Sequence, residues 1–172
     1  YTKHFDLENE KQTIVAKLPE KAQIETLFIL KDGAKENEEP VQVIDPTVDN
    51  QLIDIVKTKV GKEKIGKELT FFTQFHKIDK DGKDSVVGEV TTTQTVEEVE
   101  FEFEVPFEYK ADTLKDGEKL VATHIVYEDK EMTKEYAKHF DLKNEKQTIL
   151  AEEPEQPEIE TLFILKDGAK EN

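Results

Sequence analysis

Residues Thr91–Val105 read TTTQTVEEVEFEFEV, and this stretch decides the fold class. Apolar residues alternate with Glu from Val99 to Val105, so one face of an extended strand is apolar and the other is acidic. Turn sequences such as KDGK and KDGE bound further predicted strands. These strands are Ile24–Leu30, Leu52–Val56, Glu68–Ile78, Lys119–Tyr127 and Glu135–Phe140. Because no long helical pattern accompanies them, the sequence predicts an all-β fold, an immunoglobulin-like β-sandwich with Greek-key connections.

The composition excludes several classes of function. Asp and Glu total 40 against 24 Lys and Arg, which gives a net charge of −16, and the sequence has no basic stripe. Nucleic acids and anionic membranes attract clustered positive charge, so neither is a predicted partner of this segment. The sequence also has no apolar run long enough to span a membrane. Because the chain has no Cys, disulfides, zinc–thiolate sites and thiol catalysis are excluded.

An internal repeat defines the domain organisation. Residues 1–37 recur as residues 136–172 at a constant offset of 135, with 29 of the 37 positions identical. The differences cluster around Val15–Gln23, a polar stretch with Pro that is typical of a linker. We therefore expect one complete domain framed by parts of its neighbours in a tandem array. The expected segments are the last strand of a preceding repeat at 1–14, a linker at 15–23, the complete domain at 24–150, a linker at 151–158 and the first strand of a following repeat at 159–172.

Two charged patterns have simple interpretations. The sequence Asp79-Lys-Asp81-Gly82-Lys-Asp84 resembles part of a calcium loop but lacks the later ligands, so a hairpin turn is predicted. A stripe of Glu residues is expected to form a solvated surface rather than a cation site. The stripe comprises Glu97, Glu98, Glu100, Glu102, Glu104 and Glu108. No metal ion or other cofactor is predicted.

A third pattern carries more chemistry. His139, Asp141, Gln147 and Thr148 follow the spacing H-x-D-x-x-x-x-x-Q-T, which recurs from His4 to Thr13. A lone His in such a segment more often belongs to a hydrogen-bond network than to a reactive site. Three further features favour a reactive site over a hydrogen-bond network. Thr and Asp residues lie in two earlier predicted strands, IETLFILKDG and LIDIV, and a strand LVATHIVY precedes the His segment.

Together, Thr26 in IETLFILKDG, Asp54 in LIDIV and this spacing resemble the VaFE-type repeats of Gram-positive surface proteins, which carry an intramolecular Thr–Gln ester bond. The resemblance covers essentially the whole 135-residue period and implies an ester between Thr26 and Gln147. A hydroxyl attacks an amide only with a positioned base and a stabilised oxyanion. We expect His139 to be that base and Asp54 to orient its imidazole.

One position departs from the family pattern. Members usually have a Glu in the penultimate strand, where this sequence has His124, and we expect His124 or Glu128 to take its role. Eight extended residues would place His139 and Gln147 about 26 Å apart, too far for both to reach one hydroxyl. A turn in Asp141–Glu145 is therefore predicted to fold Gln147 back.

The resemblance implies a structural function: an extracellular, cell-wall-anchored adhesin whose stalk repeats cross-link themselves once and do not turn over as enzymes. The expected partners are neighbouring repeats, with a host surface ligand bound through other domains. One alternative is a host-ligand-binding module without a formed cross-link, and a hydrolase is a weaker one. Gln12 and Thr161 have no evident partner in this chain, although residues 4–14 could replace 139–149 by strand exchange. Phe28 and Phe140 are expected to shield the ester from water.

Overall fold

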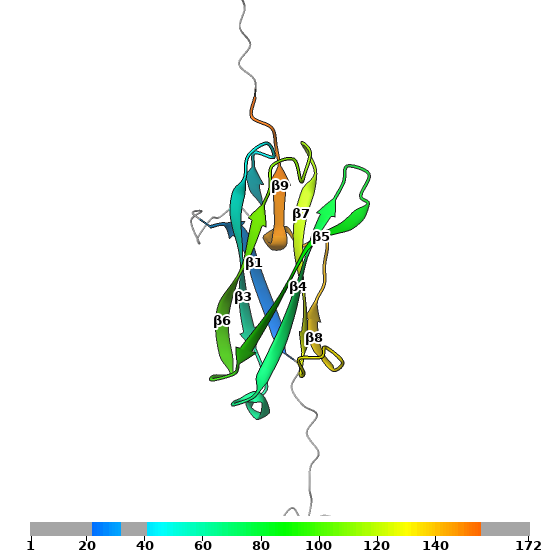
Figure 1. The fold of residues 1–172 in the computed structure, drawn as a ribbon. Coiled ribbons are helices and arrows are strands. Elements are labelled where there is room, and N and C mark those ends of the chain that lie inside the picture. Colours follow the sequence, from blue (N-terminus) through cyan, green and yellow to red (C-terminus); the bar gives the residue numbers. More distant parts are fainter. Residues whose placement is uncertain (1–21, 32–40, 156–172) are drawn as a thin grey trace, which may run out of the picture.

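Two β-sheets packed face to face form the domain (Figure 1). In this computed structural model, residues 22–31 and 41–155 are described. The smaller sheet has the order β1 (Gln23–Leu30), β3 (Asn50–Lys59), β6 (Glu100–Tyr109). The larger sheet has the order β2 (Gln42–Ile44), β9 (Thr148–Ala151), β7 (Lys119–Tyr127), β4 (Glu68–Ile78), β5 (Asp84–Thr95), and β8 (Glu135–His139) also pairs with β7. Two short 3₁₀ turns, η2 (Lys62–Lys64) and η3 (Glu145–Gln147), complete the described elements.

The strand order confirms the predicted immunoglobulin-like sandwich. The β4–β5 hairpin lies in one sheet, while β3 and β6, which flank it in the sequence, pair with each other in the other sheet. This crossing between sheets is the Greek-key arrangement of such folds. The first and last described residues lie at opposite ends of the sandwich (Figure 1).

The core lies between the sheets and is built largely from aromatic rings. Phe75 on β4 packs against Phe28 on β1 and Phe107 on β6, with ring centroids 5.4 and 4.2 Å apart. Gly88 on β5 leaves room for Phe107, because a Cβ at that position would lie 2.6 Å from the ring. Tyr109 is fully buried, and its hydroxyl donates to the carbonyl oxygen of Pro46 over 3.1 Å. These contacts tie the two sheets together through the apolar faces of their strands.

Most predicted strands are confirmed, and β4 and β7 have the predicted bounds. The single strand predicted at Thr91–Val105 is wrong, because the chain leaves β5 at Thr95 and begins β6 at Glu100. Val96 turns the chain: it is buried, and its backbone N–H and C=O bond to Lys67 and Gly66. The adjacent residues Glu97 and Glu98 interrupt the alternation at this crossing, and the single-strand prediction ignored that break.

β8 and β9 lie one after the other along the same side of β7. His139 of β8 pairs with His124, while Thr148 of β9 pairs with Val121, only three residues away on β7. Three strand residues span about 10 Å, so the chain between His139 and Thr148 must loop back on itself. A hydrogen bond from the N–H of Asn144 to the C=O of Asp141 closes that loop and confirms the predicted turn.

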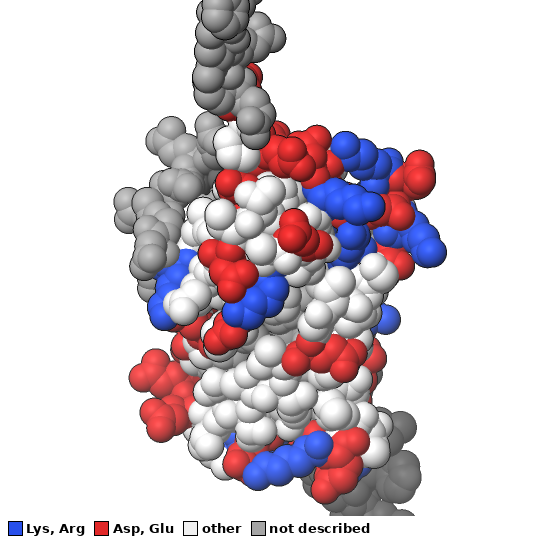
Figure 2. Space-filling view, turned by 45° about the horizontal axis from the view of Figure 1, so that its top comes forward, with Lys and Arg blue, Asp and Glu red and all other residues white. Residues whose placement is uncertain are grey.

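The hairpin predicted at Asp79–Asp84 is confirmed, and the acidic stripe lies on the surface. The N–H of Gly82 donates to the C=O of Asp79, and Gly82 adopts φ +80° in the β4–β5 hairpin. The six Glu residues of the stripe are exposed, and no cluster of potential metal ligands occurs among the residues that the structure describes. Figure 2 shows basic side chains mixed with acidic ones on the visible face. No described helix is long and apolar enough to cross a membrane.

Glu118 holds the turn that precedes β7, and its carboxylate gives the fold a pH dependence. It accepts from the Lys77 Nζ over 2.6 Å and from the Lys115 N–H over 2.7 Å. Burial alone would raise the pKa of Glu118, but these hydrogen bonds outweigh it and lower the pKa below its usual 4.5.

We expect Glu118→Gln to flatten the loss of stability in acid. Because folding lowers the pKa of Glu118, its contribution to stability is complete well above pH 4.5 and is lost as the pH falls through the folded value. Urea unfolding midpoints measured from neutral pH down to acid would show a smaller decrease in the variant than in the unaltered chain. Equal slopes would contradict this role of Glu118.

Candidate functional site

Thr26 and Asp54 face the interior of the sandwich from neighbouring strands. In the β1–β3 ladder Thr26 pairs with Val56, and Phe28 pairs with Asp54. Residues two apart on a strand share a face, so all four side chains point toward the larger sheet. Thr26 is 7% exposed, and its hydroxyl has no hydrogen-bond partner.

Asp54 binds His124 and not His139, so its predicted role in orienting His139 is wrong. The Nε2 of His124 lies 2.6 Å from Oδ2 of Asp54, and both side chains are fully buried. The Nδ1 of the same ring lies 2.9 Å from Oγ1 of Thr73 on β4. The second carboxylate oxygen of Asp54 has no hydrogen-bond partner. A buried chain of Thr73, His124 and Asp54 thus joins the two sheets across the core.

Glu128 lies away from this group, which corrects the expectation that it could replace the family Glu. Its carboxylate forms an ion pair with Lys64, whose Nζ also lies 4.4 Å from the ring centroid of Tyr136. Of the two candidates for the Glu position, only His124 contacts Asp54.

His139 ends β8 beside a cavity of about 470 Å³ that Thr26 also lines. Asn144, from the turn before η3, lines the same cavity and lies 3.1 Å from Nε2 of His139 through its Nδ2. The sequence analysis missed Asn144. Two signals were present: the same Asn recurs as Asn9 in the repeat, and Asn is a preferred residue at the start of a helical turn.

Gln147 is brought to this region by the turn. It is fully buried at the end of η3, and η3 contacts both β1 and β7 (Figure 1). Neither its carboxamide nitrogen nor its carboxamide oxygen has a hydrogen-bond partner. The turn therefore places Gln147 against the strand that carries Thr26, as its predicted position requires.

The buried polar atoms without hydrogen bonds are concentrated at this site. Six such side-chain atoms occur among the described residues, and four belong to Thr26, Asp54 and Gln147. A buried polar group that lacks a partner costs about 1–3 kcal/mol. The Thr26 hydroxyl, the Gln147 carboxamide and the Asp54 carboxylate therefore lie in the core with unmet hydrogen bonds. A reaction between the hydroxyl and the carboxamide would remove two of these unpartnered groups.

Phe140 does not shield this interior site, contrary to expectation. Phe140 follows His139 directly, so the two side chains face opposite sides of the sheet, and Phe140 is 48% exposed. Its ring packs against His76, 5.4 Å away between centroids. His76 itself bonds Asp84 over 2.8 Å and Thr123 over 3.1 Å on that outer side. Phe28, in contrast, is buried on β1, two residues from Thr26.

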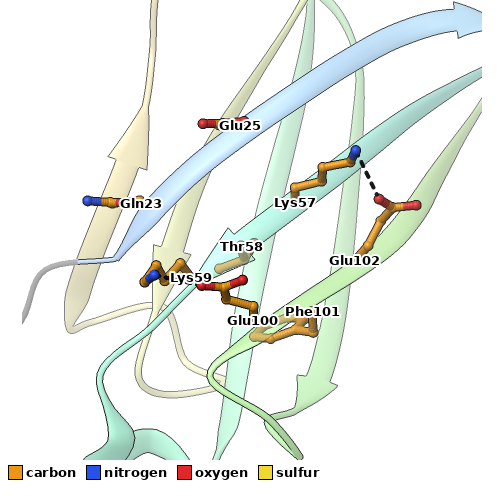
Figure 3. Close-up of a pocket in the computed structure, with 8 residues that line it drawn as sticks. All are labelled: Gln23, Glu25, Lys57, Thr58, Lys59, Glu100, Phe101 and Glu102. Atoms are coloured by element: carbon orange, nitrogen blue, oxygen red, sulfur yellow. Dashed lines mark hydrogen bonds and ion pairs between the residues drawn. The ribbon is translucent and has the colours of Figure 1, made fainter. Parts of the chain in front are cut away.

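A larger hollow of about 560 Å³ lies elsewhere, along β1, β3 and β6 (Figure 3). Its charged side chains pair with each other: Lys57 lies 3.5 Å from Glu102, and Lys59 lies 2.6 Å from Glu100. These pairs are exposed, and such pairs interact weakly. Thr58 and Gln23 also line the hollow, but Gln23 is exposed, whereas the carboxamide of Gln147 is buried against β1.

The predictions that concern the repeats fall outside the described residues. Gln12 and Thr161 lie there, together with the segments 1–14 and 159–172, so their pairing stays a prediction.

The fold of this chain is similar to that of a solved bacterial adhesin. No curated protein matches the chain. Among solved structures, a bacterial adhesin from Mobiluncus mulieris containing intramolecular disulfide, isopeptide and ester bond cross-links aligns with a TM-score of 0.59 and 17% identity. The alignment covers 78% of this chain and 58% of that one, and at this identity it shows the fold. A CARDB domain from Pyrococcus furiosus, in complex with di-metal ions, aligns at a TM-score of 0.37 and 13% identity over 86% of this chain and 94% of that one, too weakly to carry an argument.

A sequence model described as T-Q ester bond containing domain matches residues 23–151, which include Thr26, Asp54, His124, His139 and Gln147. The match covers well over half of the chain. The chain therefore belongs to the family of T-Q ester bond containing domains.

Proposed function

We propose that this domain is a structural unit of a surface adhesin and is stabilised by an ester bond between Thr26 and Gln147. One observation carries the proposal: the hydroxyl of Thr26 and the carboxamide of Gln147 are buried without hydrogen-bond partners, on elements that contact each other. A bond between Oγ1 of Thr26 and Cδ of Gln147 removes the unpartnered hydroxyl proton and the unpartnered Nε2 together.

The reaction is an acyl transfer that needs no cofactor. His139 takes the proton of Thr26, and Oγ1 attacks Cδ of Gln147 to give a tetrahedral intermediate. The C–N bond then breaks, and the nitrogen leaves as ammonia after gaining the proton that the hydroxyl lost. One O–H and one C–N bond break while one C–O and one N–H bond form, so the atoms balance. The nucleophile is consumed, which limits the domain to a single turnover.

The Asp54–His124 pair holds the Gln147 carboxamide in this proposal. It is completely buried, and Asp54 keeps one carboxylate oxygen free to accept a hydrogen bond. That oxygen complements the unpartnered N–H groups of Gln147, so it can hold the carboxamide for attack. The ring nitrogens of His124 contact Asp54 and Thr73, so His124 fixes the direction of the Asp54 carboxylate.

The adhesin role is that of a stalk repeat in a cell-wall-anchored Gram-positive surface protein. The near-identical segments 1–37 and 136–172 support a tandem array of such domains. The described ends lie at opposite ends of the sandwich, which suits a chain of domains joined head to tail (Figure 1). The high net negative charge favours a solvated surface that does not associate with its own copies. Neighbouring repeats are the proposed partners, and a host ligand would be bound by other domains.

Intact-mass measurement tests the cross-link. The unaltered chain is expected to be lighter than its sequence mass by one ammonia, whereas Thr26→Ala and Gln147→Ala are expected at their sequence masses. Thr58→Val is the matched control, because the Thr58 hydroxyl is likewise buried and unpartnered but lies on β3, outside the site. This control should retain the deficit. A full sequence mass for the unaltered folded chain would overturn the proposal.

A further inference from the structure

We propose that Thr73 is a positioning residue that fixes the direction of the hydrogen bonds in the core, so that His124 donates to Asp54 and Asp54 stays a carboxylate. The inference rests on the proposed cross-linking reaction, in which Asp54 holds the carboxamide of Gln147. It starts from a buried histidine whose two ring nitrogens both have a hydrogen-bond partner.

Thr73, His124 and Asp54 form a chain of hydrogen bonds that is shielded from solvent. Thr73 on β4 and His124 on β7 are direct partners in the ladder of the larger sheet, and Asp54 lies on β3 of the smaller sheet. Oγ1 of Thr73 lies 2.9 Å from Nδ1 of the ring, and Nε2 lies 2.6 Å from Oδ2 of Asp54. Each of the three residues is 0% exposed, so their donors and acceptors must be satisfied within the protein.

The hydroxyl proton of Thr73 fixes the direction of the first bond. A hydroxyl has one proton to donate, and a buried donor needs an acceptor. Among the described residues, the hydrogen-bond partner of this hydroxyl is Nδ1 of His124. A proton on Nδ1 would donate to Oγ1 and leave the hydroxyl proton without an acceptor. Nδ1 therefore carries the lone pair, and the ring proton is on Nε2.

The same direction continues into Asp54. With its proton on Nε2, the ring of His124 donates to Oδ2, and Asp54 accepts as a carboxylate. The opposite direction would require a proton on Oδ2 and would make the carboxyl group neutral. Oδ1 of Asp54 and the carboxamide nitrogen of Gln147 are both buried without a partner. Because a charged oxygen accepts a stronger hydrogen bond than a neutral one, Thr73 determines how firmly the carboxamide is held.

His124 acts in this arrangement as a hydrogen-bond donor and transfers no proton in the reaction. Its two ring nitrogens are occupied by Thr73 and Asp54. His139 is its cross-strand neighbour on β8, but the His124 ring has no free nitrogen with which to exchange a proton. The site therefore needs from position 124 one N–H group directed at Asp54, which an amide side chain can also supply.

The first test reads the ring of His124 directly and needs no cross-link. In Thr26→Ala, which cannot form the ester, ¹⁵N chemical shifts should show a proton on Nε2 and none on Nδ1. The signals of this ring are identified by their absence from the same spectrum of a His124→Gln variant. A proton on Nδ1, alone or together with one on Nε2, would overturn the inference, whatever the mass measurement shows for the ester.

The second test removes the hydroxyl of Thr73. Thr73→Val keeps the shape of the side chain, and ester formation should slow about tenfold because the bond to the Asp54 carboxylate is no longer held in one direction. Thr73→Ser keeps the hydroxyl and should form the ester faster than Thr73→Val. Intact mass at intervals after a short pulse of cell-free synthesis gives both rates. A serine variant no faster than the valine variant would overturn the role of Thr73 and leave the ester proposal standing.

Thr123→Val is the matched control for Thr73→Val. Thr123 is also buried, and its hydroxyl also contacts a histidine, but this is His76 on the outer side of the larger sheet. The control should form the ester at the rate of the unaltered chain. A slowing equal to that of Thr73→Val would show a general effect of losing a buried hydroxyl and would overturn the inference.

The third test asks whether position 124 supplies a donor or a proton. In His124→Gln, Oε1 can accept from Thr73 and Nε2 can donate to Asp54, so both bonds keep their direction. Ester formation should slow by less than about 100-fold, whereas the loss of a proton-transfer group costs about 10²–10⁴-fold. A slowing of about 100-fold or more would overturn the donor role. A full sequence mass for the unaltered chain would overturn the ester proposal and leave the ring measurement to decide on Thr73.

Discussion

Thr26→Val is expected to lower the midpoint of thermal unfolding by about 15 °C, since a domain of this size shifts by about 3 °C per kcal/mol. Thr26 and Gln147 are 121 residues apart in the sequence, and a covalent tie between them closes almost the whole domain. By analogy with disulfides, closing a loop of this length stabilises the folded state by about 5 kcal/mol through the unfolded chain. Valine keeps the shape of threonine, so loss of the tie is the main change. Circular dichroism during heating measures the midpoint.

Thr58→Val is the control that distinguishes loss of the cross-link from loss of a buried threonine hydroxyl. Its hydroxyl is as buried and unpartnered as that of Thr26, so its replacement by a methyl group should leave stability unchanged or slightly higher. Midpoints that agree within a few degrees among the unaltered chain, Thr26→Val and Thr58→Val would contradict a stabilising cross-link.

His139→Ala is expected to slow ester formation by about 10²–10⁴-fold, the usual contribution of a general base. The purified variant should therefore retain its full sequence mass for long enough to be studied. His139 lines an open cavity together with Thr26, so added imidazole can occupy the space of the missing ring. We expect added imidazole to restore the loss of ammonia over time. Intact-mass spectra taken at intervals after the addition measure that loss.

His76→Gln is the control for this experiment. His76 is also buried, but it bonds Asp84 and Thr123 on the outer side of the larger sheet. Its replacement should leave the cross-link intact. Complete ester formation in His139→Ala without imidazole would rule out His139 as the base.

Much of the fold followed from local patterns. Turn sequences bound Glu68–Ile78 and Lys119–Tyr127, with KDGK after the first and KDGE before the second, and these boundaries predicted β4 and β7. The loop between His139 and Gln147 was also predictable, since chain length alone forbids an extended path. The short strands β2 and β9, with three and four residues, carry too little pattern to be recognised.

The partner of Asp54 was not predictable in the same way. Asp54 and His124 lie 70 residues apart on different sheets, and their contact depends on how the sheets are stacked. Sequence spacing gives the face of each side chain but not the facing residue in the opposite sheet. Asn144 was missed for another reason: its contacts with His139 and with the backbone N–H of Lys146 depend on the path of the turn, which spacing does not encode.

The places where the described chain enters and leaves the sandwich determine how far a pulled domain can lengthen. Thr26 is the fourth residue of β1, and Gln147 immediately precedes β9, the last strand described. With these two side chains joined, the 120 residues between Thr26 and Gln147 lie outside the path between the two ends. Unfolding that stretch would otherwise release about 400 Å of contour length, at roughly 3.3–3.6 Å per residue. In a single-molecule pulling trace the cross-linked domain would show no such step and would respond as an almost inextensible link.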